Sequence, residues 1–115
     1  IGMRRDPVFG PVILLGMGGI FAETLGDKVL RVAPLPAGEG VAMARELKGF
    51  ALLSGARGRP PADLEALGEV LERLSALAIA YPDIAEVDIN PLLVWPKGKG
   101  VFAVDALVVT VGMPN

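Results

Sequence analysis

The order of elements along the chain predicts an α+β fold, in which a mostly antiparallel sheet carries two helices on one face. The 115 residues read as a strand, a hairpin, two helices and a closing hairpin. Residues 62–81 show the clearest helical periodicity, and residues 84–111 are rich in the β-branched and aromatic side chains typical of strands. The chain has no internal repeat, so a single domain, or part of one, is the simplest interpretation.

The composition is that of a globular chain with one hydrophobic core. Hydrophobic residues make up 52% of the chain and charged residues 21%, and the mean hydropathy is +0.53. A net charge of −2 argues against nucleic acid or an anionic membrane as the main partner. The longest uncharged stretch, residues 7–22, is interrupted by Pro11 and several glycines and therefore does not predict a membrane span.

Histidine and cysteine are both absent from the chain. Their absence removes the commonest general base, thiol chemistry and zinc–thiolate sites, and it favours a cytoplasmic location. The chain begins with Ile1 and carries nothing that resembles a signal peptide. We therefore interpret it as a fragment of a longer protein.

The first third of the chain predicts strands. Residues 1–11 are expected to form an extended lead-in whose charged side chains lie in solvent. Residues 12–15 are a short apolar run that predicts a buried strand. A Gly-Asp pair separates residues 20–25 from residues 28–33, and this arrangement indicates a hairpin.

Two helices are expected in the middle of the chain. Apolar residues recur at helical spacing over residues 38–48. The helix at residues 62–81 has a longer stripe of leucines, is preceded by two prolines and ends before Pro82. Residues 50–59 are ambiguous, and we expect a short strand that leads into a Gly/Arg loop.

The closing hairpin is expected to pair residues 84–95 with residues 101–111. A four-residue turn at 96–99 would place Asn90 opposite Asp105. A five-residue turn would put these two residues on opposite faces unless a bulge restored the register. Because both strands are apolar at nearly every position, we expect both faces of the hairpin to be covered.

Oxygen-bearing side chains occupy alternate positions of the first of these strands, at Glu86, Asp88 and Asn90, so they share one face. Together with Asp105 on the neighbouring strand, they offer the hard oxygen ligands that suit Mg²⁺. The alternative is a polar outer face that binds nothing. Three acceptors beside a carboxylate favour the cation site.

Two further residues are candidates for a site that handles phosphate. Arg57 lies in a glycine-rich loop just before a helix N-terminus, where the guanidinium and the helix dipole favour an anion. A solvated loop explains this stretch equally well. Glu23 lies within an apolar run, where an edge or outward-facing carboxylate is the ordinary explanation.

The combination of these segments resembles a known family. Residues 86–94 (EVDINPLLV) and 104–106 (VDA) resemble the closing hairpin of ATP-grasp proteins. The likeness is greatest to the ADP-forming acyl-CoA synthetases and to the related succinyl-CoA synthetase β subunit. It extends upstream through residues 9–23, 32–35 and 55–63, in the same order along the chain.

The resemblance implies the C-terminal subdomain of an ATP-grasp domain, which holds ATP or ADP between two lobes. Such enzymes interconvert acyl-CoA, ADP and phosphate with a free acid, CoA and ATP, through an acyl phosphate and a phosphohistidine. By motif position, Asn90 and Asp105 would be the Mg²⁺ ligands, and Asp88 would lie in or just behind that shell beside the nucleotide. Arg57 would contact phosphate oxygens, and Glu23 would line the catalytic cleft.

The resemblance assigns residues 1–115 to the C-terminal portion of the domain and leaves out the lobe that supplies the ATP-contacting lysine. The CoA-binding part and the phosphohistidine would come from the remaining domains or from an α-type subunit, so the chain alone is expected to be inactive. One alternative is a degenerate ATP-grasp segment with a regulatory or structural role in a protein acetyltransferase fusion. Another is an interaction module whose acidic face binds nothing. The presence of Asn90, Asp105 and Arg57 favours the enzyme.

Overall fold

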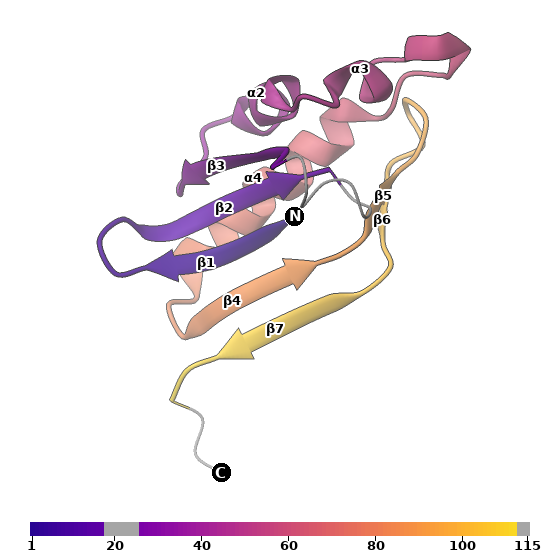
Figure 1. The fold of residues 1–115 in the computed structure, drawn as a ribbon. Helices are drawn as coiled ribbons and strands as arrows, with labels where there is room; N and C mark the ends of the chain where they lie inside the picture. Colours follow the sequence, from indigo (N-terminus) through magenta and orange to yellow (C-terminus); the bar gives the residue numbers. More distant parts are fainter. Residues whose placement is uncertain (18–25, 113–115) are drawn as a thin grey trace.

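The computed structural model describes residues 1–17 and 26–112. In this part of the chain, a five-stranded antiparallel sheet has the order β3-β2-β1-β4-β7, and a two-stranded sheet pairs β5 with β6 (Figure 1). The elements, in chain order, are β1 (Gly2–Asp6), β2 (Gly10–Gly16), β3 (Lys28–Val32), α2 (Glu39–Glu46), α3 (Phe50–Leu53), the 3₁₀ turn η1 (Ala56–Gly58), α4 (Leu64–Ala80), β4 (Ile84–Ile89), β5 (Leu92–Val94), β6 (Val101–Ala103) and β7 (Ala106–Thr110).

Helices α2 and α4 lie against one face of the large sheet, which confirms the predicted α+β architecture (Figure 1). The core forms between these layers because alternate strand residues face the helices. The sheet contributes Met3, Ile13, Leu15, Val29 and Val87, and the helices contribute Met43, Leu67, Leu71 and Leu74. Among the described helices, none combines the length and apolar character that a membrane crossing requires.

The two helices approach each other most closely at a pair of glycines. A Cβ atom on Gly40 of α2 would overlap the backbone of Gly68 in α4. Glu72, one turn further along α4, accepts hydrogen bonds from the backbone N–H groups of Gly38 and Gly40, each at 3.2 Å. The start of α2 is therefore held against α4 by close packing and by a carboxylate that satisfies its free N–H groups.

Strand β1 corrects the expectation of a solvated lead-in. It lies at the centre of the sheet between β2 and β4, and its Met3 is only 1% exposed. The Arg5 guanidinium donates to the carbonyl oxygens of Ala78, Tyr81 and Ile84 at 2.6–2.8 Å. The arginine therefore satisfies carbonyl groups where α4 ends, a long-range arrangement that the local charge pattern does not reveal.

Residues 50–59 are helical rather than a strand followed by a loop, because they form α3 and η1. The buried Asp27 carboxylate accepts from the N–H groups of Lys48 at 2.7 Å and Gly49 at 2.9 Å, directly before α3. A short apolar run such as FALL has no periodicity that separates a helical turn from a strand. The distant carboxylate supports the start of this turn.

Two of the remaining predicted strands are confirmed, and the third lies outside the described residues. Residues 12–15 lie within β2, and residues 28–33 contain β3, which pairs with β2. The expected partner strand at residues 20–25 lies outside the described residues.

The closing hairpin has the predicted register, but it divides between the two sheets. Residues whose numbers add to 195 face each other throughout β5–β6, as in Leu93↔Phe102, and in β4–β7 from Ile89 back to Glu86, as in Val87↔Val108. The register then shifts by one residue, so that Ile84 faces Thr110. The expectation that both faces are covered is wrong for this chain, because every residue of β7 is exposed. The strand lies at the edge of the sheet beyond the area that α4 covers.

Candidate metal and nucleotide site

Asn90 and Asp105 face each other where the closing hairpin passes from the large sheet to the small one. The Asn90 N–H donates to the Asp105 carbonyl oxygen at 3.1 Å, and the Trp95 N–H donates to the Gly100 carbonyl oxygen at 3.0 Å. These bonds confirm the register that the four-residue turn predicts. Both Asn90 and Asp105 are exposed.

The donor set around this pair fits Mg²⁺. One Asp105 carboxylate oxygen accepts from the Ala106 N–H at 2.9 Å. Among the described residues, no protein donor meets the Asn90 amide oxygen or the second Asp105 oxygen. Mg²⁺ is usually bound through one or two carboxylates, with water and phosphate oxygens completing its shell. The described residues contain no group of three or more acids that could enclose a metal ion alone.

Asp88 and Glu86 share the face of β4 that the helices leave open, whereas Val87 between them is buried, as the alternation predicts. Glu86 pairs with Arg4 on β1 at 3.2 Å. Asp88 is exposed and lies opposite Gly2 on one side and Leu107 on the other. Asp88 is therefore the carboxylate of this face that stands nearest along the strand to Asn90 and has no arginine beside it.

A cavity of about 220 Å³ adjoins Asn90. Apolar residues from β2, α3, α4 and β5 line it, and Asn90 is the one polar side chain among the described lining residues. The surroundings of Asn90 therefore combine an apolar pocket with exposed hard oxygen donors, a combination typical of ligand sites.

Asp63 anchors the hairpin that carries this pair, a role that the sequence interpretation missed. As the N-cap of α4, its side chain accepts from the Ala66 N–H at 3.1 Å. Its other carboxylate oxygen accepts from the N–H groups of Gly98 at 3.1 Å and Gly100 at 2.9 Å, in the turn of the hairpin. The same carboxylate thus caps a helix and fixes the turn that sets the Asn90–Asp105 register.

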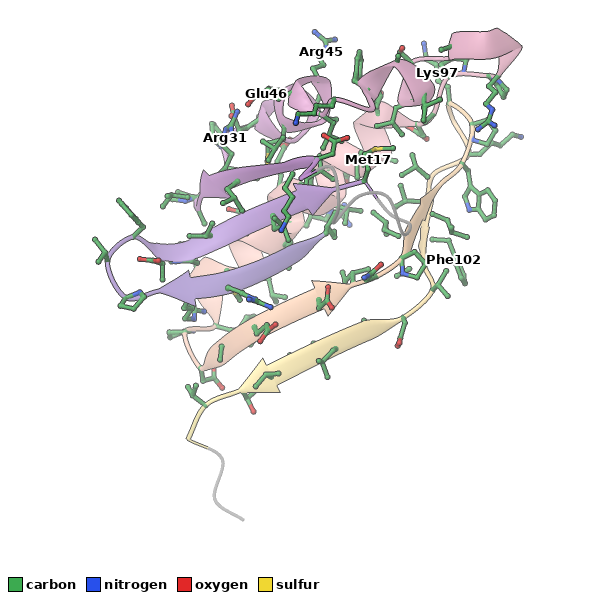
Figure 2. All side chains as sticks on the ribbon, viewed as in Figure 1. Met17, Arg31, Arg45, Glu46, Lys97 and Phe102 are labelled. Atoms are coloured by element: carbon green, nitrogen blue, oxygen red, sulfur yellow. The ribbon has the colours of Figure 1, made fainter. Side chains whose placement is uncertain are left out.

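Backbone contacts reinforce this anchor. The Asp63 N–H donates to the Trp95 carbonyl oxygen, and the Lys97 N–H donates to the Pro61 carbonyl oxygen. Figure 2 shows Lys97 in the turn of the hairpin, close to the start of α4. An Asp before a helix indicates an N-cap, but its contact with Gly98 and Gly100 depends on tertiary structure.

The hydrogen bonds also change the acidity of Asp63. The N–H groups of Ala66 and Gly100 lower the pKa of Asp63, and Gly98 and the Lys97 charge act in the same direction. Hydrogen bonding to the charged form stabilises it, so the carboxylate stays ionised at mildly acidic pH.

The described structure does not test the other two predicted site residues, Arg57 and Glu23. Arg57 lies in η1, between Gly55 at φ 103° and Gly58 at φ 73°. The placement of its side chain is outside the description, and Glu23 lies outside the described residues. Their roles remain predictions.

Known proteins match this chain over most of its length. A family model described as an ATP-grasp domain matches residues 1–110. The chain is 44% identical over 101 residues to acetate–CoA ligase (ADP-forming) I of Archaeoglobus fulgidus, which covers 88% of this chain and 15% of that protein. It is 42% identical over 109 residues to the acetate–CoA ligase (ADP-forming) I subunit beta of Pyrococcus furiosus, covering 95% of this chain and 46% of that subunit.

A solved structure agrees with these relatives. An acetyl-coenzyme A synthetase 1 of Candidatus Korarchaeum cryptofilum, in complex with coenzyme A and Mg-AMPPCP, superposes with a TM-score of 0.88 at 40% identity. The match covers 95% of this chain and 50% of that chain, so the present chain spans about half of the solved chain and less of the curated relatives. The chain therefore belongs to the ATP-grasp family, as an ATP-grasp segment of the ADP-forming acyl-CoA synthetase type.

Proposed function

We propose that this chain is the Mg²⁺- and phosphate-binding half of the ATP-grasp domain of an ADP-forming acyl-CoA synthetase. The observation that carries the proposal is the direct pairing of Asn90 with Asp105, which places two exposed hard-oxygen side chains on neighbouring strands. The Korarchaeum relative was solved with Mg-AMPPCP, so a related fold accommodates a magnesium nucleotide.

Each candidate residue then has a distinct task. Asn90 and Asp105 would hold Mg²⁺, and Asp88 would receive a hydrogen bond from a water or hydroxyl beside the nucleotide. When bound, Mg²⁺ supplies positive charge to the phosphate oxygens. Arg57 would offer its guanidinium to the phosphate, and Glu23 would line the cleft. These tasks fit phosphoryl transfer, in which positioning and charge neutralisation dominate.

The proposed reaction converts acyl-CoA, ADP and phosphate into a free acid, CoA and ATP, and it runs in either direction. The chain has no histidine, so a phosphohistidine step requires a group from another domain or from an α-type subunit. The Pyrococcus relative is named as a subunit beta, which supports the second arrangement. Relatives named for acetate and for 4-hydroxybutyrate show that the proposal concerns the reaction class, not one acid.

The regulatory alternative gains no support from these relatives, because those named above are ligases or synthetases and none is described as an acetyltransferase.

The test is Asp105→Asn in the full-length gene product. This change removes the carboxylate charge and keeps the size and backbone pairing of the residue. We expect Mg²⁺-dependent ADP affinity, measured by calorimetry, and ATP formation to fall by more than about tenfold, with little change in melting temperature.

Asp83→Asn is the matched control, since Asp83 is also an exposed acid but lies at the other end of β4. It should retain both activities. If Asp105→Asn melted early yet kept its specific activity and its Mg-ADP affinity, Asp105 would be a structural residue and the proposed site would be wrong.

A further inference from the structure

The outer end of the closing hairpin is basic. Residues 95–104 contain Lys97 and Lys99 and no aspartate or glutamate, in a chain whose net charge is −2. Both lysines are exposed, and so is Arg59, which lines one hollow together with Pro96 of the hairpin. Within the described part of the chain, no carboxylate forms an ion pair with any of these three cations. The hairpin end therefore presents positive charge that has no ion-pair partner there.

The acids beside this end do not cancel its charge. The Asp63 carboxylate is already bound by backbone N–H groups at the start of α4 and in the hairpin turn. Glu65 lines a second hollow, of about 540 Å³, but Lys97 and Arg45 line the same hollow (Figure 2). Positive side chains therefore remain in excess on both sides of the hairpin turn.

Exposed aromatic side chains accompany these cations. Trp95 is 44% exposed and Phe102 is 56% exposed, and Phe102 lies opposite Leu93, which is 38% exposed. Tryptophan, phenylalanine and arginine are enriched in protein interfaces, where a few such anchors carry most of the binding energy. We call the following residues the hairpin surface: Arg59, Trp95, Lys97, Lys99 and Phe102.

The hairpin surface is held in place and adjoins the proposed metal site. Asp63 binds the N–H groups of the turn, so the surface is formed before any partner arrives, which lowers the entropic cost of binding. The same hairpin carries Asn90 and Asp105. Trp95 is five residues from Asn90, at most about 17 Å along an extended strand. A protein part that docks on the hairpin surface thus lies beside the nucleotide phosphates proposed for that pair.

We propose that the hairpin surface docks the part of the enzyme that carries the phosphohistidine, through an acidic face of that part. This inference rests on the proposed function, in which the histidine comes from another domain or from an α-type subunit. To exchange a phosphoryl group with the nucleotide, the imidazole must reach the phosphates beside Asn90 and Asp105, so its carrier must approach this hairpin. A phosphorylated imidazole is itself an anion, and positive charge on the hairpin favours its approach.

The shape of the surface fits a protein partner better than a second small ligand. A small ligand is ordinarily held in one concave pocket with a few convergent polar groups. Here Arg59 lines one hollow and Lys97 lines another. Exposed aromatic side chains combined with separated cations are typical of a protein interface.

The docking serves one of two half-reactions. From ATP, the bond between the γ-phosphorus and the ADP oxygen breaks, a P–N bond to the imidazole forms, and the imidazole N–H proton is released. In the other half-reaction, acyl-CoA and phosphate give CoA and an acyl phosphate, which passes its phosphoryl group to the same imidazole and leaves the free acid. This second route needs no nucleotide, so it should not depend on the hairpin surface.

The test is the double variant Arg59→Glu/Lys99→Glu in the full-length protein, together with its α-type subunit where that is a separate chain. Phosphohistidine formation from ATP should slow by about tenfold or more and lose most of its dependence on salt. Phosphohistidine formation from phosphate and the acyl-CoA that the wild type turns over should keep its rate, and calorimetry should give an unchanged Mg-ADP affinity. Lys28→Glu/Arg73→Glu is the matched control, since it reverses one exposed lysine and one exposed arginine away from the hairpin; it should leave both half-reactions unchanged.

Each other outcome overturns the inference. An unchanged ATP half-reaction would show that the hairpin surface docks nothing during phosphoryl transfer. An equal loss in both half-reactions, or a lower melting temperature or a dissociated assembly with the ATP half-reaction intact, would indicate a permanent contact with another part of the protein. A weaker Mg-ADP affinity would assign these cations to the nucleotide instead. Failure of the proposed function is distinguishable, because the wild type itself would then form no phosphohistidine from ATP.

Discussion

Asp63 joins two parts of the molecule through one carboxylate. It is 8% exposed and serves both the first turn of α4 and the turn of the β5–β6 hairpin. Because the hairpin sets the register of Asn90 and Asp105, the arrangement of the proposed site depends on a residue that lies outside it. Asp63 is in this sense a positioning residue.

We predict that Asp63→Asn makes the protein less stable at pH 7 and less sensitive to acid. Asparagine retains the N-cap but cannot carry the charge that Gly98 and Gly100 stabilise. Since the folded-state pKa of Asp63 is lowered, its contribution is complete above the unfolded pKa of about 3.9 and is lost as pH falls through the folded pKa. The difference in unfolding free energy between wild type and variant, from urea titrations at several pH values, should therefore shrink below about pH 4.

A pH-independent difference would show that the charge of Asp63 adds nothing to the hydrogen bonds from Ala66, Gly98 and Gly100, and would contradict the prediction. Asp83→Asn, which alters an exposed acid away from the hairpin turn, is the control for the general effect of removing a negative charge.

At the level of elements, the closing hairpin fixes the strand register at the proposed site, and the α2–α4 contact fixes the distance between the two helices. The β4–β7 and β5–β6 pairings share one register across the break at Asn90 and Pro91. Helix α2 is held at a fixed distance from α4, because Gly40 and Gly68 leave no room for a side chain between them.

We predict that Gly40→Ala destabilises the fold by about 1–3 kcal/mol, the usual cost of overpacking. The added methyl group would overlap the backbone of Gly68, so the helices would have to separate. Gly16→Ala is a suitable control, since its Cβ would stand 3.6 Å from the nearest atom, the Asp27 carbonyl oxygen. Urea denaturation measures both, and an equal effect of the two changes would contradict the close helix contact.

The elements also show what the sequence could predict. Helix 62–81 and the Asn90–Asp105 register were accessible because each depends on local features, namely a repeat of leucines and the length of a turn. Strand β1 and helix α3 were not, because Arg5 and Asp27 stabilise them through backbone groups far along the chain. The hydrogen bonds from Gly98 and Gly100 to Asp63 were also missed, because these residues are far apart in the sequence.

The whole molecule is a sheet with one covered face. Leu15 is 4% exposed beneath the helices, whereas Leu30 on the other face is 58% exposed. Asp88 and Glu86 lie on this open face. The fold therefore separates its tasks: one face holds the core, and the other remains available to a ligand or to another part of the protein.

We predict that Leu15→Ala costs about 2–5 kcal/mol of stability in the 115-residue chain, whereas Leu30→Ala costs less than about 0.5 kcal/mol. The two variants remove the same atoms from neighbouring strands, so the difference reports only the coverage of the two faces. Thermal or urea unfolding gives both values. Comparable losses would mean that the open face is packed as firmly as the helix side.

Because β4–β7 and β5–β6 share one register, the length of the hairpin turn determines which residue lies opposite Asn90. The Gly98 and Gly100 amides are held by Asp63, while Asn90 and Asp105 lie five or more positions away along each strand. Removing one residue from this turn would slide one strand past the other and bring a different neighbour opposite Asn90. The length of a short surface turn, usually the part of a protein most tolerant of change, is here tied to the composition of a distant ligand set.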